Sequence, residues 1–270
     1  MKDCGSIMVA LEDQKMISNK EVSFLTHLIT DLGAEAERIK KSKLNHEIKG
    51  DGSPISDADR LINHELIKFI SRTEYKNMIS EENKQISFKQ RNSWRFFWLI
   101  DPIDGTKEYL NKGDDYTINL ALCMDNAPIF SVVYAPARQE FFSAEKGRGS
   151  YINDKKLKIK KSNNKSIKIV VSKSHLNTDT SQFIESLGKL YDIEVLQFGS
   201  SLKICKIAQG EADLYPRFGP TMEWDICASD LILREAGGVI VSLNNEEMTF
   251  NKESLLNPFF IAANHRKYIT

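Results

Sequence analysis

The stretch WLIDPIDGTKEYL, residues 98–110, runs from an apolar strand into a polar turn. Asp101 ends the apolar run, and a second carboxylate, Asp104, comes three positions later, directly before Gly105 and Thr106. Asp-Pro-x-Asp-Gly suits an ordinary turn or helix start, because Asp caps amides, Pro presets φ and Gly accepts a positive φ. It equally suits a site for an ion and a phosphate, so these residues alone leave both interpretations open.

Three physical details favour a binding site in this stretch. The strand delivers Asp101 to a strand end, where loops commonly build sites. Pro102 has no amide hydrogen, so the loop offers carbonyls, including that of Ile103, as hard oxygen ligands. Gly105 and Thr106 place backbone N–H groups at a predicted helix start, which suits an anion. A tight turn here would converge two carboxylates and a carbonyl on Mg²⁺, which prefers oxygen ligands.

Composition and charge describe an ordinary globular chain and narrow its partners. The 270 residues are 41% hydrophobic and 27% charged, enough for one large domain or two lobes. Lys and Arg number 37, as do Asp and Glu, so net charge favours neither a nucleic-acid nor a membrane partner. Four scattered cysteines without a C-x-x-C pair predict a reduced, cytoplasmic protein. No segment approaches the roughly 20 apolar residues of a membrane span, and the N-terminal run IMVAL is too short for a signal peptide.

The hydrophobic period changes along the chain from helical to strand-like. Residues 22–39 and 56–70 carry apolar side chains at helical spacing, and Ser56 with Asp59 fits a capping box for the second helix. From about Trp94 the period becomes two, which predicts an antiparallel meander. The predicted meander strands are residues 116–123, 129–135, 140–144 and 149–153.

A different pattern begins near residue 165, where short apolar strands alternate with helical segments. These predicted strands are residues 167–172, 193–198, 212–215, 237–243 and 258–264. Alternation of this kind indicates an α/β layout. We therefore predict a layered α/β fold of two fused lobes, residues 1–165 and 166–270.

Other acidic positions could join the 101–106 stretch, although each also has an ordinary structural role. Glu81 and Glu82 follow a short apolar strand, but surface glutamate pairs are common. Asp225 opens an apolar helical stretch, where the helix dipole stabilises any first-turn acid. Asp59 already belongs to the predicted capping box. None of these residues identifies a site by itself.

Taken together, these segments resemble the lithium-sensitive, Mg²⁺-dependent phosphomonoesterase superfamily, which includes inositol monophosphatase and the 3'(2'),5'-bisphosphate nucleotidases. The matching pieces are SPISDAD (53–59), SEE (80–82), DPIDGTKEY (101–109) and WDICASD (224–230), in family order. Three further pieces favour the bisphosphate-nucleotidase branch: VVSKSH (170–175), GSSLKICKIAQGEADLYPRFGP (199–220) and the KEY after DGT. The stretch before about Ile17 and the helix body ICASD are less typical. The resemblance implies an alternating αβαβα sandwich of the inositol monophosphatase and fructose-1,6-bisphosphatase type.

The resemblance also implies a catalytic centre with two or three Mg²⁺ ions. The implied metal ligands are Glu81, Asp101, the carbonyl of Ile103, Asp104 and Asp225. Asp101 would bridge two ions. Glu81 would be a catalytic residue as well as a metal ligand, and Glu82 would lie behind it. Asp59 and Thr106 would orient and deprotonate the attacking water. The amides of Gly105 and Thr106 would hold the phosphate.

Substrate selection is expected from the second lobe. Gly199, Ser200 and Ser201 begin a helical segment whose amides and hydroxyls could meet a second phosphate or a ribose, and Lys203 could add a charge there. The alternative is a helix start with a solvated lysine. Arg217 could grip the non-scissile phosphate with two hydrogen bonds, or form a surface ion pair. His175 could stack near the base, or be a capped loop histidine.

The sequence therefore predicts an enzyme that releases the 3'-phosphate of adenosine 3',5'-bisphosphate by a metal-activated water, giving AMP. The five histidines lack H-E-x-x-H spacing, so zinc hydrolysis is not indicated. One alternative is an inositol or broad sugar-phosphate phosphatase; another is a non-catalytic nucleotide-binding protein. The lysine run 155–168 is interpreted as a solvated strand edge, with an anion or acidic-lipid patch as the alternative, so peripheral membrane association is left open. No nucleic-acid partner is expected, and the choice between monomer and homodimer is also left open.

Overall fold

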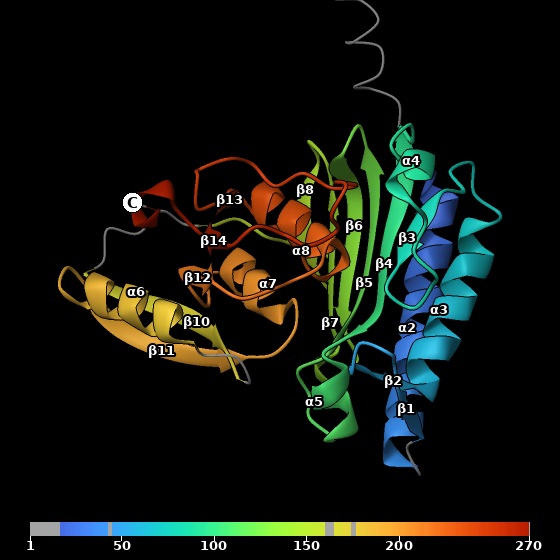
Figure 1. Cartoon of the computed structure of the whole chain (residues 1–270), viewed down its shortest axis with the longest axis horizontal. Coiled ribbons are helices and arrows are strands. Elements are labelled where there is room, and N and C mark those ends of the chain that lie inside the picture. The colour runs from blue at the N-terminus through green and yellow to red at the C-terminus, as the bar shows by residue number, and fades with distance from the viewer. Residues whose placement is uncertain (1–16, 43–44, 160–164, 174–176, 270) are drawn as a thin grey trace, which may run out of the picture.

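The computed structural model describes residues 17–42, 45–159, 165–173 and 177–269. Two β-sheets and three sets of helices stack in alternating layers, which is plain when the molecule is viewed along its shortest axis (Figure 1). The order of layers is a helix pair, a seven-stranded sheet, a second helix pair, a five-stranded sheet and an outer helix. This arrangement confirms the layered αβαβα fold predicted above.

The first layer consists of two amphipathic helices, α2 (Asn19–Lys41) and α3 (Asp57–Ile70). Each begins with a capping box, in which a serine side chain and an acidic side chain satisfy helix-end amides. The predicted box of Ser56 and Asp59 is therefore confirmed. A short hairpin of β1 (His46–Ile48) and β2 (Pro54–Ser56) connects the two helices.

The larger sheet has the order β3-β4-β5-β6-β7-β8-β9. Its strands are β3 (Met78–Ser80), β4 (Phe96–Asp104), β5 (Thr117–Met124), β6 (Ala127–Ala135), β7 (Glu140–Glu145), β8 (Gly149–Ile152) and β9 (Lys155–Lys156). Neighbouring strands are antiparallel from β4 onward, which confirms the predicted meander, whereas β3 joins β4 in parallel. Short helices α4 (Phe88–Arg91), α5 (Thr106–Leu110) and η1 (Pro136–Arg138) lie between strands.

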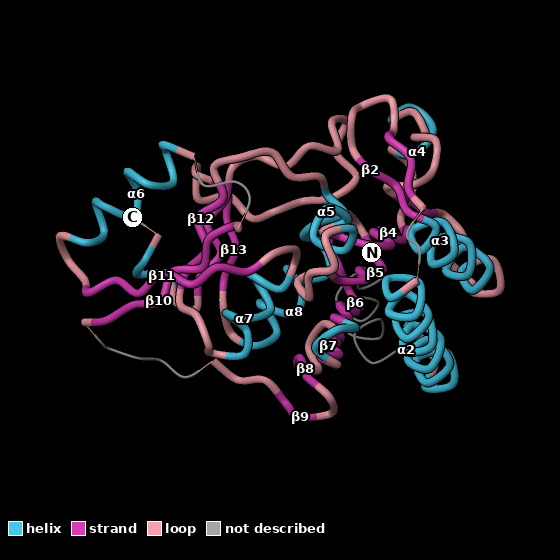
Figure 2. Tube along the Cα trace, turned by 90° about the horizontal axis from the view of Figure 1, so that it is seen from below, coloured by secondary structure: helices cyan, strands magenta, loops and turns pink. Residues whose placement is uncertain are grey.

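The smaller sheet has the order β11-β10-β12-β14-β13. Its strands are β10 (Ser166–Ser172), β11 (Asp192–Phe198), β12 (Leu214–Arg217), β13 (Val239–Ser242) and β14 (Phe260–Ala263). Helix α6 (Thr178–Gly188) covers its outer face, and α7 (Leu202–Gln209) and α8 (Glu223–Ala236) lie between the sheets (Figure 2). The short helix η2 (Arg266–Tyr268) is the last element of the described chain. Strand β12 begins and ends two residues later than predicted, so Arg217 lies on a strand.

The hydrophobic core is continuous between the two sheets. One cluster of buried residues includes Ala121 and Cys123 of β5, Val170 of β10, Tyr215 of β12 and Ile226 of α8. The other face of β5 packs on α2 and α3, so both faces of this strand are buried. An alternation of apolar and polar residues would predict only one buried face. The division into lobes at residue 165 stays a prediction.

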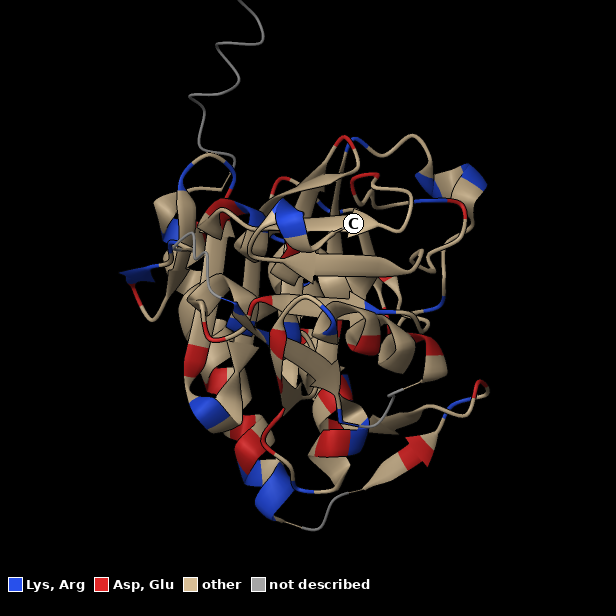
Figure 3. Ribbon diagram, turned by 90° about the vertical axis from the view of Figure 1, so that its left-hand side faces the viewer, with Lys and Arg blue, Asp and Glu red and all other residues tan. Residues whose placement is uncertain are grey.

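Charges of both signs are spread over the molecule (Figure 3), and the two cysteines Cys123 and Cys227 form no disulfide. Acidic and basic residues are interspersed along the ribbon in Figure 3. Lys155 and Lys156 form the exposed edge strand β9, in agreement with a solvated edge, although residues 160–164 of the lysine run lie outside the described chain. Cys123 and Cys227 are buried and unbridged, with their sulfur atoms 3.4 Å apart. Among the described helices, none has the length and apolarity that a membrane crossing requires.

Candidate active site

The 101–104 stretch is a bulged strand end and not the tight turn that its sequence predicts. Strand β4 continues through Asp104, because Asp101 pairs with Asn119 of β5 and Asp104 pairs with Thr117, with a register shift between the two pairs. A bulge changes the direction in which side chains point. Gly105 then adopts φ 89°, a left-handed conformation that favours glycine, and α5 begins at the next residue.

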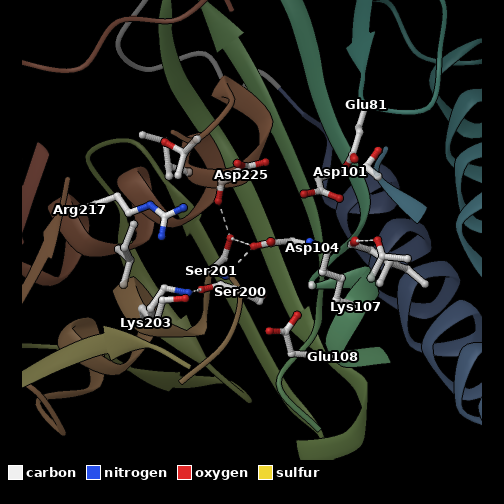
Figure 4. Close-up of a pocket in the computed structure, with 18 of the residues that line it drawn as sticks. Glu81, Asp101, Asp104, Lys107, Glu108, Ser200, Ser201, Lys203, Arg217 and Asp225 are labelled. Atoms are coloured by element: carbon white, nitrogen blue, oxygen red, sulfur yellow. Dashed lines mark hydrogen bonds between the residues drawn. The ribbon is translucent and has the colours of Figure 1, made fainter. Parts of the chain in front are cut away.

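A cavity of about 230 Å³ opens where this strand end meets α7, α8 and β12. Figure 4 shows residues from the first half of the chain, such as Asp101 and Asp104, on one side of it, and residues from the second half, such as Lys203 and Arg217, on the other. The predicted site residues that line it are Glu81, Asp101, Ile103, Asp104, Gly105, Thr106, Ser200, Ser201, Lys203, Arg217 and Asp225. Asp59 and Gly199 support the site through neighbours described below, and His175 lies outside the described residues.

The acidic side of the cavity is electrostatically unbalanced. Asp101 is 1% exposed, and its Oδ1 atom is buried without a hydrogen-bond partner in the described chain. Burial first, and then the charges of Glu81 and Asp104, raise the pKa of Asp101 well above its usual range. Burial and Asp104 likewise raise the pKa of Asp225. Carboxylates crowded in this way are stabilised by a bound cation.

In the described part of the chain, no three His, Cys, Asp or Glu side chains are already gathered closely enough to hold a metal ion. Several of the predicted ligands make other contacts, among them Asp225, whose Oδ2 accepts from the Met222 amide at 2.8 Å. Asp104 Oδ2 accepts hydrogen bonds from the amide (2.6 Å) and the hydroxyl (2.9 Å) of Ser201. Glu81 Oε1 accepts one from Lys49 Nζ at 2.9 Å. The predicted ligand set therefore stays a prediction.

Lys49 is a site residue that the sequence analysis missed. It lies in the β1–β2 connection, and its ammonium group bridges Glu81 (2.9 Å) and Glu82 (3.0 Å). The Glu82 side chain is only 2% exposed, and burial, followed by the charge of Glu81, raises its pKa to about 7. Glu81 is among the residues that line the cavity and Glu82 is not, so the placement of Glu82 behind a metal ligand stays a prediction. Nothing in the local sequence distinguishes this lysine from a surface one.

Asp59 and Thr106 lie next to each other at the edge of the acidic side. Thr106 Oγ1 is 3.4 Å from Asp59 Oδ1 and 3.0 Å from the carbonyl oxygen of Ile103. Asp59 is fully buried, and its Oδ2 accepts from the amide (2.8 Å) and hydroxyl (2.5 Å) of Ser56. Burial raises the pKa of Asp59 to about 6 despite the Ser56 hydrogen bonds. The capping box thus directs the other carboxylate oxygen toward Thr106.

The opposite side of the cavity is basic (Figure 4). Lys203 is only 7% exposed, so the alternative of a solvated lysine is wrong. Its ammonium group donates to the carbonyl of Ser200 at 2.7 Å and lies 5.4 Å from the centre of the Tyr215 ring. Burial lowers the pKa of Lys203 to about 8. Arg217 donates to the Pro220 carbonyl at 2.8 Å, and its buried Nε has no partner in the described chain.

Polar side chains of β5 connect the two sides and were also missed. Asn119 Nδ2 donates to Ser201 Oγ at 2.8 Å, and Thr117 Oγ1 lies 2.6 Å from Ser200 Oγ. Both residues interrupt an otherwise apolar central strand. Buried polar groups need partners, so their positions in the strand are a usable signal for a site.

Comparison with known proteins relates this site to one family. The family model described as "Inositol monophosphatase family" matches residues 19–269. The 3'(2'),5'-bisphosphate nucleotidase CysQ of Shigella flexneri is 35% identical to this chain over 217 residues, which cover 78% of this chain and 86% of the relative.

Solved structures agree with this relationship. CysQ from Bacteroides thetaiotaomicron, described as a bacterial member of the inositol monophosphatase family, is 32% identical, with a TM-score of 0.79 and coverage of 88% of this chain and 95% of that one. An IMPase/NADP phosphatase solved with Mg²⁺ and phosphate shares the fold, with 19% identity, a TM-score of 0.76 and coverage of 93% and 95%. By its sequence and by its layered structure, this chain belongs to the inositol monophosphatase family.

Proposed function

We propose that this chain is a Mg²⁺-dependent phosphatase that hydrolyses the 3'-phosphate of adenosine 3',5'-bisphosphate to give AMP and phosphate. The observation that carries the proposal is a cavity with an acidic side and a buried basic side. A substrate with one phosphate would leave Lys203 and Arg217 without an anionic partner. A nucleotide with two phosphates offers one to each side, and the nucleotidase relatives at up to 35% identity support this substrate class.

The acidic side fits a divalent cation. Its donors are oxygen atoms, and Asp101 Oδ1 is buried without a partner in the described chain. Two or three Mg²⁺ ions would be held by Glu81, Asp101, the carbonyl of Ile103, Asp104 and Asp225. When bound, such ions supply neutralisation of the phosphate and a lower pKa for water.

The protein's own residues position the reacting groups. The Gly105 and Thr106 amides, at the start of α5, orient the oxygens of the 3'-phosphate. Thr106 Oγ1 and Asp59 Oδ1, 3.4 Å apart, form the path by which the attacking water loses its proton. Asp59 is the final acceptor, because it is a carboxylate near neutral pH with a pKa of about 6.

The basic side binds the phosphate that does not react. Lys203 contributes a point charge, and Arg217 contributes a planar guanidinium suited to two parallel hydrogen bonds. Gly199, Ser200 and Ser201 form the loop that places Lys203, through the hydrogen bond from its ammonium group to the Ser200 carbonyl. The role of His175 near the base stays a prediction.

Arg217→Ala is expected to raise KM for the bisphosphate by about 10- to 100-fold, since a hydrogen bond to a charged group contributes about 1.5–3 kcal/mol. Adenosine 3'-monophosphate has no second phosphate, so its KM should change by less than about threefold. Steady-state kinetics on both substrates measure the difference, with Arg217→Lys as the matched variant that keeps charge but loses the planar fork. An equal loss on both substrates would contradict the role of Arg217.

A substrate panel with phosphate detection tests the function itself. Purified protein is assayed on adenosine 3',5'-bisphosphate, adenosine 3'-monophosphate and inositol 1-phosphate, with Mg²⁺, with a chelator, and with Li⁺ added. We expect Mg²⁺-dependent release that is fastest on the bisphosphate. A preference for inositol 1-phosphate would assign the chain to the sugar-phosphate alternative. Nucleotide binding without any phosphate release would assign it to the non-catalytic one.

A further inference from the structure

Asp115, between α5 and β5, is a buried carboxylate that joins three segments of the chain. Its side chain is 1% exposed. Arg138 of η1 donates to Oδ1 from Nε at 3.1 Å and from a terminal nitrogen, Lys173 Nζ lies 2.6 Å from Oδ2, and the Gly199 amide donates to Oδ2 at 3.1 Å. Burial would raise the pKa of Asp115, but the hydrogen bonds from Lys173, Arg138 and Gly199 outweigh it, so the pKa lies below its usual value.

Two glycines of the site pack against this same residue. A side chain on Gly105 would place its Cβ 3.0 Å from the backbone oxygen of Asp115. A Cβ on Gly199 would lie 2.6 Å from that oxygen and 2.9 Å from the Asp115 Cβ. Gly105 belongs to the loop that would hold the reacting phosphate, and Gly199 belongs to the loop of the basic side. Both loops therefore pack so closely on the Asp115 backbone that neither glycine leaves room for a side chain.

From Gly199 the chain leads directly to the basic side. Ser200 adopts φ 56°, a left-handed conformation that must be held by its surroundings, and its carbonyl accepts from Lys203. Ser201 then donates to Asp104 on the acidic side. On the other flank of Gly199, the Phe198 ring lies 5.5 Å from the Arg138 guanidinium. Residues 199–201 therefore connect Asp115 to both Lys203 and Asp104 through hydrogen bonds.

We propose that Asp115 is a positioning residue that sets the separation between the acidic and basic sides of the cavity, so that a nucleotide bisphosphate can engage both. The inference rests on the proposed function. Asp115 is not among the residues that line the cavity and acts through Gly199. Its negative charge is required because it balances two cations, Arg138 and Lys173; an asparagine could still accept from the Gly199 amide but would not balance them.

The test compares Asp115→Asn with wild type on the bisphosphate and on adenosine 3'-monophosphate. We expect the ratio of the two kcat/KM values to fall by about tenfold or more, mainly through KM for the bisphosphate, because small misplacements of binding groups are costly. The ratio does not depend on how much of the sample is folded. Asp230→Asn is the matched control, since Asp230 is also 1% exposed and ion-paired, to Arg234 at 2.7 Å, but lies outside the site. Its ratio should equal that of wild type.

Each outcome decides between the two hypotheses. Suppose that wild type prefers the bisphosphate and Asp115→Asn has the same ratio of kcat/KM values, either because both values are unchanged or because both fall equally. This result overturns the positioning role and leaves the proposed function in place. A wild type that does not prefer the bisphosphate overturns the proposed function, and this inference with it. If Asp115→Asn does not fold, Lys173→Gln replaces it, because Lys173 is 46% exposed and its loss removes only one contact. For Lys173→Gln, a ratio of kcat/KM values that is lowered by about threefold supports the positioning role of Asp115, and an unchanged ratio overturns it.

Discussion

Asp101→Asn is expected to lower kcat by roughly 10³-fold, since a metal ligand that contributes several kcal/mol of transition-state stabilisation is lost. The substitution keeps the shape of the side chain and removes its charge. The same change should make the metal-free protein more stable, because Asp101 is buried, lacks a partner at Oδ1 in the described chain and lies near Glu81, Asp104 and Asp225. Activity and stability are thus expected to change in opposite directions.

The dependence of stability on pH follows from the raised pKa of Asp101. Because the folded protein holds protons that the unfolded chain releases, the free energy of unfolding without metal decreases as pH rises above about 4, the ordinary carboxylate value. The decrease should be shallower in Asp101→Asn. In wild type, Mg²⁺ at 100 times its Kd should add about 2.7 kcal/mol to the free energy of unfolding, and the variant should gain less.

Urea unfolding of wild type and Asp101→Asn at several pH values, with a chelator or with Mg²⁺ added, measures these differences in the free energy of unfolding. Asp125→Asn is the control, because Asp125 is 62% exposed and pairs only with Arg95 among its described ion pairs. A variant that is less stable than wild type in chelator, yet equally stabilised by Mg²⁺, would refute the assignment of Asp101 as a metal ligand.

Asp59→Asn is expected to lower kcat by about 10²- to 10⁴-fold, the usual contribution of a positioned general base. In wild type, the rate should rise with pH until Asp59 is deprotonated, since a base acts only in its ionised form, and burial sets its pKa at about 6. The variant should lack this acidic limb. Its stability should change little, because an asparagine oxygen can still accept from the amide and hydroxyl of Ser56.

The pH profile of kcat for wild type, Asp59→Asn and Thr106→Val measures this role. Thr106→Ser is the matched control, since it keeps the hydroxyl that lies 3.4 Å from Asp59 Oδ1. We expect Thr106→Ser to resemble wild type and Thr106→Val to resemble the asparagine variant. An acidic limb that persists unchanged in Asp59→Asn would exclude this carboxylate as the base.

Local sequence patterns were sufficient for most elements of the fold. Helix α3 was predicted with its capping box, because apolar spacing and the Ser56–Asp59 pair are properties of a few consecutive residues. The segment 101–104 was predicted as a turn, although it is a bulged strand end. Pairing with Asn119 and Thr117 of β5 decides this conformation, and turn propensity contains no information about such a partner.

The site shows the same division between local and distant information. Motifs in the chain were enough to name Asp101, Asp104, Asp225 and Arg217 as site candidates, since each carries its chemistry in its own side chain. Only the folded protein reveals that Lys49 bridges Glu81 and Glu82, and that Asp115 joins Arg138, Lys173 and Gly199. These contacts connect residues 23 to 84 positions apart. Burial and pairing across such separations are set by the packing of two sheets around α7 and α8, which no local pattern of residues records.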